Sequence, residues 1–297
     1  MFEEFKSAFS RPNNGHRQLI IINVAVFLVL AILMVLSRWF RFESAFQLIH
    51  NQFSLPSNFS EFITRPWTLI TYFFTHDLGG IFHILFNMLF LYWFGKLFIE
   101  YLGSDKMIAV YVLGGLAGGL VYLLVYNVIP NPPPFLSGDA TLVGASAAVF
   151  AVMVGAATLL PDYTFFLLLL GPVKIKWIAA VYIFLSILGS VGSNAGGEIA
   201  HLGGALIGFI YIKQLQVGIN WGGWITSVLD WFGNIFTASP KVKVSYRKSE
   251  PSNVKKPTNA SGISQREIDA ILDKISDGGY ESLTKDEKEK LFKASKK

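Results

Sequence analysis

Four residues in three separate apolar stretches carry the side chains that peptide hydrolysis requires. Ser146 is a candidate nucleophile, and His201 is a candidate general base. A serine becomes reactive when a base within hydrogen-bond reach takes its proton, and the oxyanion that then forms needs hydrogen-bond donors. His83 and Asn87 are four residues apart and share one helix face, so they are candidates for those donors.

The chain around these residues has the composition of a membrane protein. Of its 297 residues, 52% are hydrophobic and 15% are charged, whereas soluble domains carry about 25% charged residues. The absence of cysteine excludes a disulfide scaffold and a thiol nucleophile. The predicted fold class is therefore an all-α polytopic membrane protein.

Six apolar runs are long enough, or nearly so, to be spanning helices. A spanning helix needs about 20 apolar residues to cross a hydrocarbon core about 30 Å thick. The first run is too long for the apolar part of a signal peptide, so we expect it to remain in the protein. The runs are 18–37, 81–100, 107–126, 142–160, 177–191 and 196–213.

The distribution of lysine and arginine predicts the orientation, because cytoplasmic connections carry an excess of these residues. Basic residues precede the first run, flank the connections between runs two and three and between runs four and five, and follow the sixth run. The connections 127–141 and 192–195 contain none. We therefore expect both termini to be cytoplasmic, in a cell membrane (inner or plasma). The long connection 38–80 then lies outside, partly in the interface, with some fold of its own.

The four polar residues share a depth in this topology. Ser146 lies about one turn inside the outer boundary, His201 between one and two turns, and His83 and Asn87 within two turns, all within roughly 3–9 Å of the same surface. Unrelated packing residues have no reason to share a depth. A common depth favours one site that is open to outside water, with His76, Asp77, Gly79 and Gly80 at its rim.

Small residues at four-residue spacing could bring the nucleophile and the base together. Such stripes let helix backbones approach closely. Phe150, one turn below Ser146, would pack against the imidazole of His201. One stripe adjoins Ser146 and the other adjoins His201: Ala147, Ala151 and Gly155, and Gly196, Ala200, Gly204 and Gly208.

Three strings in this order resemble the rhomboid family of intramembrane serine proteases: His83-Ile-Leu-Phe-Asn87, Gly144-Ala-Ser146 and Ala200-His201-Leu-Gly-Gly204. The similarity covers about residues 60–213, and Arg65-Pro-Trp67 also resembles the first loop of the family. The resemblance implies a six-helix bundle and a dyad of Ser146 and His201. It implies oxyanion donors at His83, Asn87 and the Ser146 backbone, with Gly144, Phe150 and Gly204 in support.

Three positions depart from the family pattern. Ala147 replaces the usual glycine, and its methyl group could crowd the oxyanion site. Phe150 stands where a tyrosine is common, which keeps the stacking but loses a hydroxyl. Glu198, three residues before His201, could pair with the imidazole or face the outer water, and we favour the second.

The resemblance predicts an endopeptidase that cleaves transmembrane segments of membrane proteins near the outer face. The alternative is a non-catalytic rhomboid-like protein that binds transmembrane clients. A transporter is a weaker possibility, because the polar residues are confined to the outer side. We expect no cofactor and no metal, since no HExxH motif occurs. We expect lipid and membrane-protein partners and no nucleic acid.

The remaining segments complete the predicted domain organisation. Residues 1–17 form a cytoplasmic segment before a membrane domain at 18–217, and 218–237 form an interfacial amphipathic segment. Residues 238–262 read as a flexible linker. Residues 263–297 contain two capping boxes, Ser264–Glu267 and Thr284–Glu287, and predict a cytoplasmic helical hairpin that either docks a partner or only stabilises the chain.

Overall fold

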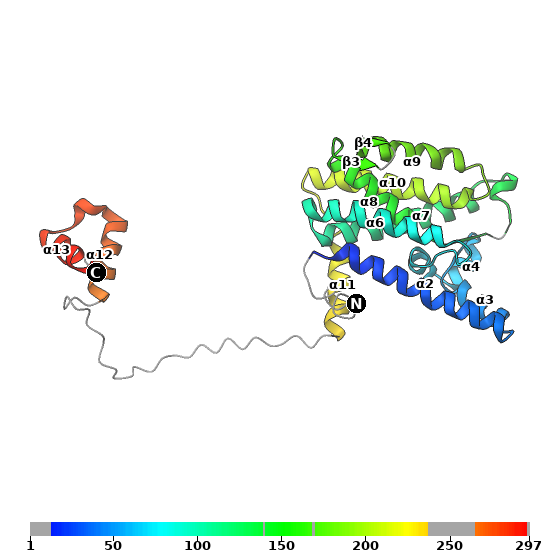
Figure 1. The fold of residues 1–297 in the computed structure, drawn as a ribbon, viewed down its shortest axis with the longest axis horizontal. Coiled ribbons are helices and arrows are strands. Elements are labelled where there is room, and N and C mark those ends of the chain that lie inside the picture. The colour runs from blue at the N-terminus through cyan, green and yellow to red at the C-terminus, as the bar shows by residue number, and fades with distance from the viewer. Residues whose placement is uncertain (1–12, 139, 168–169, 237–264, 296–297) are drawn as a thin grey trace. The chain divides into compact units, whose positions relative to one another are not determined.

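The computed structural model describes residues 13–138, 140–167, 170–236 and 265–295 (Figure 1). It divides into two compact units, Met1–Ser239 and Pro240–Lys297. The predicted linker 238–262, the first capping box at Ser264 and most of the predicted N-terminal segment 1–17 lie outside the described residues.

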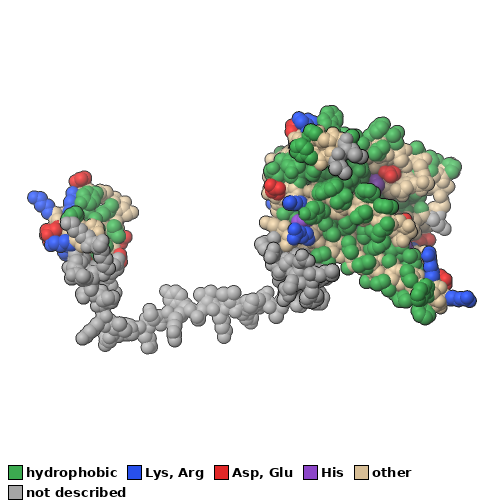
Figure 2. All heavy atoms as spheres, in the orientation of Figure 1, with side chains coloured by type: hydrophobic (Ala, Val, Ile, Leu, Met, Phe, Trp, Pro, Cys, Tyr) green, Lys and Arg blue, Asp and Glu red, His purple; other side chains and the backbone are tan. Residues whose placement is uncertain are grey.

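Each of the six apolar runs forms a helix in the first unit. Four of these helices are long and apolar enough to cross a membrane: α2 (Gly15–Trp39), α6 (Ile81–Leu102), α7 (Ser104–Val128) and α10 (Ala195–Gln216). The other two, α8 (Ser146–Leu159) and α9 (Ile175–Gly189), have 14 and 15 residues. Apolar side chains cover most of the face of this unit that Figure 2 shows, as expected of a surface that meets lipid.

The start of α8 differs from the prediction. The apolar run begins at Leu142, but Thr141–Leu142 form a short strand, β2, and the helix begins at Ser146. β2 pairs antiparallel with β1 (Leu55–Pro56), with Leu55 opposite Leu142. Ser146 therefore lies at the N-terminal end of its helix and not one turn inside it.

The long connection 38–80 has a fold of its own, as predicted. It contains α3 (Glu43–Asn51), α4 (Phe59–Thr64), α5 (Thr68–Thr71) and the 3-10 turn η1 (Tyr72–Phe74), in addition to β1. The buried hydroxyl of Tyr72 donates to the carbonyl of Gly115 on α7 at 2.6 Å. This bond and the strand pair attach the connection to the helix bundle.

The small-residue stripes of α8 and α10 face each other, as predicted. A Cβ atom added at Gly204 would collide with the carbonyl of Ala147, and one added at Gly208 would collide with the carbonyl of Ala151. Only glycine permits backbones to lie this close. Gly196 packs instead against Tyr122 of α7, so the α10 stripe contacts two helices.

Two further connections of the first unit contain short elements of their own. The 3-10 turn η2 (Pro134–Leu136) precedes β2, and a hairpin of β3 (Thr164–Leu167) and β4 (Gly171–Lys174) joins α8 to α9. Asp162 binds both Lys174 and Lys176, at 2.9 and 2.8 Å, and these two lysines hold its pKa at about 2. The predicted amphipathic segment contains α11 (Gly223–Phe236).

The second unit is a small helical hairpin. It consists of α12 (Gln265–Gly278), the turn η3 (Tyr280–Ser282) and α13 (Lys285–Ser295). The predicted capping box at its second helix is present, because the Thr284 backbone N–H donates to Glu287 Oε2 at 2.7 Å and the Glu287 N–H donates to Thr284 Oγ1 at 3.4 Å. Lys274 of α12 forms an ion pair with Glu287 of α13, with Nζ 2.9 Å from Oε1.

Candidate active site

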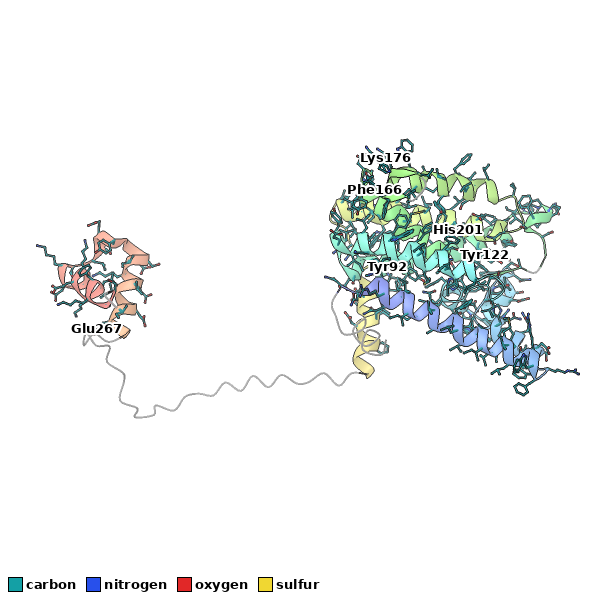
Figure 3. The ribbon with its side chains drawn as sticks, in the orientation of Figure 1. Tyr92, Tyr122, Phe166, Lys176, His201 and Glu267 are labelled. Carbon is teal, nitrogen blue, oxygen red and sulfur yellow. The ribbon has the colours of Figure 1, made fainter. Side chains whose placement is uncertain are left out.

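A cavity of about 360 Å³ brings the predicted residues together. Ser146, His201, His83 and Asn87 all line it, although they come from three helices. Figure 3 shows His201 on the helix bundle. The remaining lining is mostly aromatic or small: Phe82, Phe86, Phe90, Val143, Phe150, Asn194 and Gly197.

The backbone before Ser146 is bent so that the serine heads its helix. Gly144 has φ of 133°, a value that side-chain-bearing residues rarely adopt, and its N–H donates to the Tyr72 carbonyl at 3.0 Å. The Ala145 carbonyl accepts the first helical hydrogen bond, from Val149. The N–H groups of Ser146, Ala147 and Ala148 therefore belong to the first turn, where no partner within the helix exists.

His201 is held on both its face and its Nδ1 edge. Its ring stacks on Phe150 with centroids 4.4 Å apart and planes 14° apart, as predicted. Nδ1 lies 3.0 Å from Glu198 Oε2 and 3.2 Å from Ser186 Oγ. The expectation that Glu198 faces the outer water is therefore wrong. Glu198 is one turn of α10 from His201, so its carboxylate lies at the Nδ1 edge of the imidazole, and 23% of the Glu198 side chain is exposed.

His83 and Ser146 meet around the bare Cα of Gly144. A Cβ atom there would lie 3.1 Å from His83 Nε2 and 3.5 Å from Ser146 Oγ. A side chain at this position would press against the His83 ring, and the positive φ of Gly144 would strain it further.

The Asn87 amide is only partly engaged. It donates to the His83 carbonyl at 2.8 Å, one turn back along α6, and has a second N–H. Within the described residues, no hydrogen bond joins Ser146 Oγ to His201. The two side chains share a cavity, and apo catalytic hydrogen bonds often close only when substrate binds.

Of the residues predicted at the rim, Asp77 lines a neighbouring cavity, and the prediction is wrong for His76. Asp77 lines a second cavity of about 420 Å³, which shares His83, Val143, Asn194 and Gly197 with the first. His76 is fully buried, with its ring 5.5 Å from that of His83. Burial lowers the pKa of His76 to about 3, so this imidazole is neutral near pH 7.

The methyl group of Ala147 does not crowd the cavity. It points toward α7, where a Cβ atom on Gly118 would lie only 2.5 Å from it. A glycine on the facing helix thus provides the room that the extra methyl group needs.

Three residues of the site were missed at the sequence level: Ser186, Gly189 and Gly118. Ser186 offered a signal, because it is a polar residue inside an apolar run. The two glycines offered none, since their effect depends on which side chain faces them. In the described part of the chain, no group of three or more His, Cys, Asp or Glu residues could hold a metal ion.

The helices and their lipid-facing surface define an all-α polytopic integral membrane protein. Residues 64–216 match the rhomboid domain family, and the chain belongs to that family. It is similar to "RHOMBOID-like protein 12, mitochondrial" of Arabidopsis thaliana, with 32% identity over 208 residues, or 66% of this chain. The match spans 59% of the length of that relative. Residues 260–297 match a family of unknown function (DUF6576).

Proposed function

We propose that this protein is an intramembrane serine endopeptidase that cleaves transmembrane segments of membrane proteins near the outer face. The observation that carries the proposal is the single cavity lined by Ser146, His201, His83 and Asn87. Membership of the rhomboid family supports it. In this mechanism, Ser146 attacks the scissile carbonyl while His201 takes its proton, and His201 then protonates the leaving amine.

The oxyanion of the tetrahedral intermediate would be stabilised at the start of α8. The Ser146 N–H lies in the first turn of the helix, where it has no helical partner. His83 Nε2 lies across Gly144 from Ser146, and Asn87 lines the same cavity. Loss of one such donor typically lowers the rate by about 10²–10³-fold.

Water can reach this site because α8 is short. Its 14 residues span about 21 Å at 1.5 Å per residue, whereas the hydrocarbon core is about 30 Å thick. The difference leaves room for an aqueous opening above Ser146. A substrate helix must unwind before its backbone can enter, so we expect glycine or other helix-destabilising residues at the cleaved position.

The test is labelling of the purified protein by a fluorophosphonate probe, which reacts with activated serines. We expect the wild type to be labelled, Ser146→Ala to remain unlabelled, and His201→Ala to be labelled at least about 10²-fold more slowly. Ser190→Ala, a substitution at an exposed hydroxyl at the end of α9, is the matched control and should label normally. Undiminished labelling of Ser146→Ala would refute the assignment.

The alternative function is a non-catalytic protein that binds transmembrane clients. It predicts an unlabelled wild type together with intact client capture in proteoliposomes. Capture without labelling would decide for the alternative.

We also propose that all six apolar helices cross a cell membrane (inner or plasma), with both termini and the 263–297 hairpin cytoplasmic. The natural absence of cysteine makes this directly testable. A single Ser137→Cys in the α7–α8 connection should react with an impermeant maleimide added outside intact cells, and Ser282→Cys in η3 should react only after lysis. The reverse pattern would overturn the orientation.

The role of the hairpin is a separate proposal. We propose that it docks a cytoplasmic partner, and deletion of residues 263–297 should then release that partner while labelling of Ser146 continues. If deletion lowers thermal stability instead, the hairpin is a stabilising appendage.

A further inference from the structure

We propose that Glu198 is a positioning residue that fixes the tautomer of His201 and balances the charge the imidazole acquires, so that the site works as a triad. The inference rests on the proposed function. It starts from one contact, in which Glu198 Oε2 lies 3.0 Å from His201 Nδ1. The two residues are three apart on α10, so one helical turn sets the contact.

The contact determines which imidazole nitrogen can act as the base. An ionised carboxylate only accepts hydrogen bonds, so the proton of neutral His201 must lie on Nδ1. Nε2 is then left with a lone pair on the side of the ring away from Glu198. Without the carboxylate, Nδ1 would keep only the Ser186 hydroxyl, which can donate as well as accept. The proton could then occupy either nitrogen, and only one of the two tautomers could accept the Ser146 proton.

Residues of α9 surround the Glu198 side chain and the Nδ1 edge of His201. Ser186 of α9 is buried, and its hydroxyl lies 3.2 Å from His201 Nδ1. One turn later, a Cβ atom added at Gly189 would lie 2.9 Å from Glu198 Cγ and 3.1 Å from its Cδ. The glycine thus leaves a slot in α9 that the glutamate side chain fills. The carboxylate is held by packing as well as by its hydrogen bond.

The carboxylate also acts during the proposed reaction. As the bond from Ser146 Oγ to the substrate carbon forms, the hydroxyl proton passes to His201 Nε2, and the ring becomes a cation. His201 and Glu198 have only 13% and 23% of their side chains exposed, so water screens this charge incompletely. Glu198 keeps its negative charge throughout and stabilises the imidazolium, while His83 is the other titratable group that lines the cavity beside His201.

The first test measures the rate of fluorophosphonate labelling over a range of probe concentrations. This separates the maximal rate of the covalent step, kinact, from the probe concentration that gives half of that rate, KI. We expect Glu198→Gln to lower kinact on the order of 10²-fold, with KI and Tm unchanged. Gly189→Ala keeps every polar group but closes the slot, so it should lower kinact as well. Glu100→Gln, at the exposed end of α6, is the matched control and should leave kinact unchanged.

The second test does not require activity. In protein labelled with ¹⁵N-histidine at pH 8, the His201 signals, identified by their loss in His201→Ala, should show the Nδ1–H tautomer, and Glu198→Gln should show a mixture. A wild-type kinact in Glu198→Gln, or a wild-type His201 protonated on Nε2, overturns the inference. If Ser146→Ala is still labelled, the proposed function is refuted. The role of Glu198 is then decided by the tautomer of His201 alone.

Discussion

The contact between α8 and α10 predicts the effect of one added methyl group. In Gly204→Ala, the new Cβ would lie 2.8 Å from the carbonyl carbon of Ala147 and 3.2 Å from its Cα, and closer still to the carbonyl oxygen. Ordinary van der Waals contact begins at 3.4 Å. A close-packed interior has no void to receive the new methyl group. The Ala147 carbonyl carbon must therefore move away by at least about 0.6 Å.

The size of the effect follows from what must move. Overpacking of this kind costs about 1–3 kcal/mol, and the better helix propensity of alanine offsets up to about 1 kcal/mol. Ala147 directly follows Ser146, the proposed nucleophile, so its displacement also moves Ser146. A misplacement on the order of 1 Å in an active site costs about 10²-fold in rate. We expect activity to fall much more than stability.

The assay combines the rate of fluorophosphonate labelling with Tm in the same detergent. Gly155→Ala is the matched control on α8, because its new methyl group would meet the Phe98 and Ile212 side chains at 3.2 and 3.4 Å and the Gly208 carbonyl oxygen at an ordinary 3.6 Å. These side chains can yield, so labelling should stay within a few-fold of wild type. If Gly204→Ala labels at the wild-type rate with an unchanged Tm, the close α8–α10 contact is not present in the protein as assayed.

Three further predictions concern stacking, loop attachment and the tail. Phe150→Leu should lower labelling by more than tenfold because it removes the ring that stacks on His201, whereas Phe150→Tyr should label normally; equal rates would contradict the stacking role. Tyr72→Phe should destabilise the protein by about 1 kcal/mol, seen as a lower Tm, because it deletes a buried hydrogen bond. The Thr284 N–H and Lys274 lower the pKa of Glu287 from 4.5 to about 2. Its stabilising effect is therefore complete above about pH 4.5 and is lost as the pH falls toward 2. Amide NMR signals of residues 285–295 should broaden over that range, and Glu287→Gln should remove the dependence.

The sequence predicted the contacts that depend on periodicity. Phe150 lies one turn from Ser146, and the small-residue stripes recur every four positions, so helix geometry alone indicated the stacking on His201 and the close α8–α10 contact. These predictions required only that both segments be helical.

The sequence did not predict features that depend on a partner far along the chain. Leu142 continues an apolar run, yet it is extended because it pairs with Leu55, and hydropathy cannot detect a strand pair between distant residues. The position of Glu198 depends on a missing side chain at Gly189, on another helix. His76 is polar but fully buried, because the folded connection packs its ring 5.5 Å from that of His83.

The strand pair between β1 and β2 has a mechanical consequence. Leu55 and Leu142 are opposite one another, and the Gly144 N–H donates to the Tyr72 carbonyl, so the connection 38–80 holds the backbone at two places just ahead of Ser146. A displacement of that connection would be transmitted to Ser146 through these hydrogen bonds. An antibody fragment that binds α3 or α4 should therefore change the rate at which a fluorophosphonate labels Ser146, without entering the cavity.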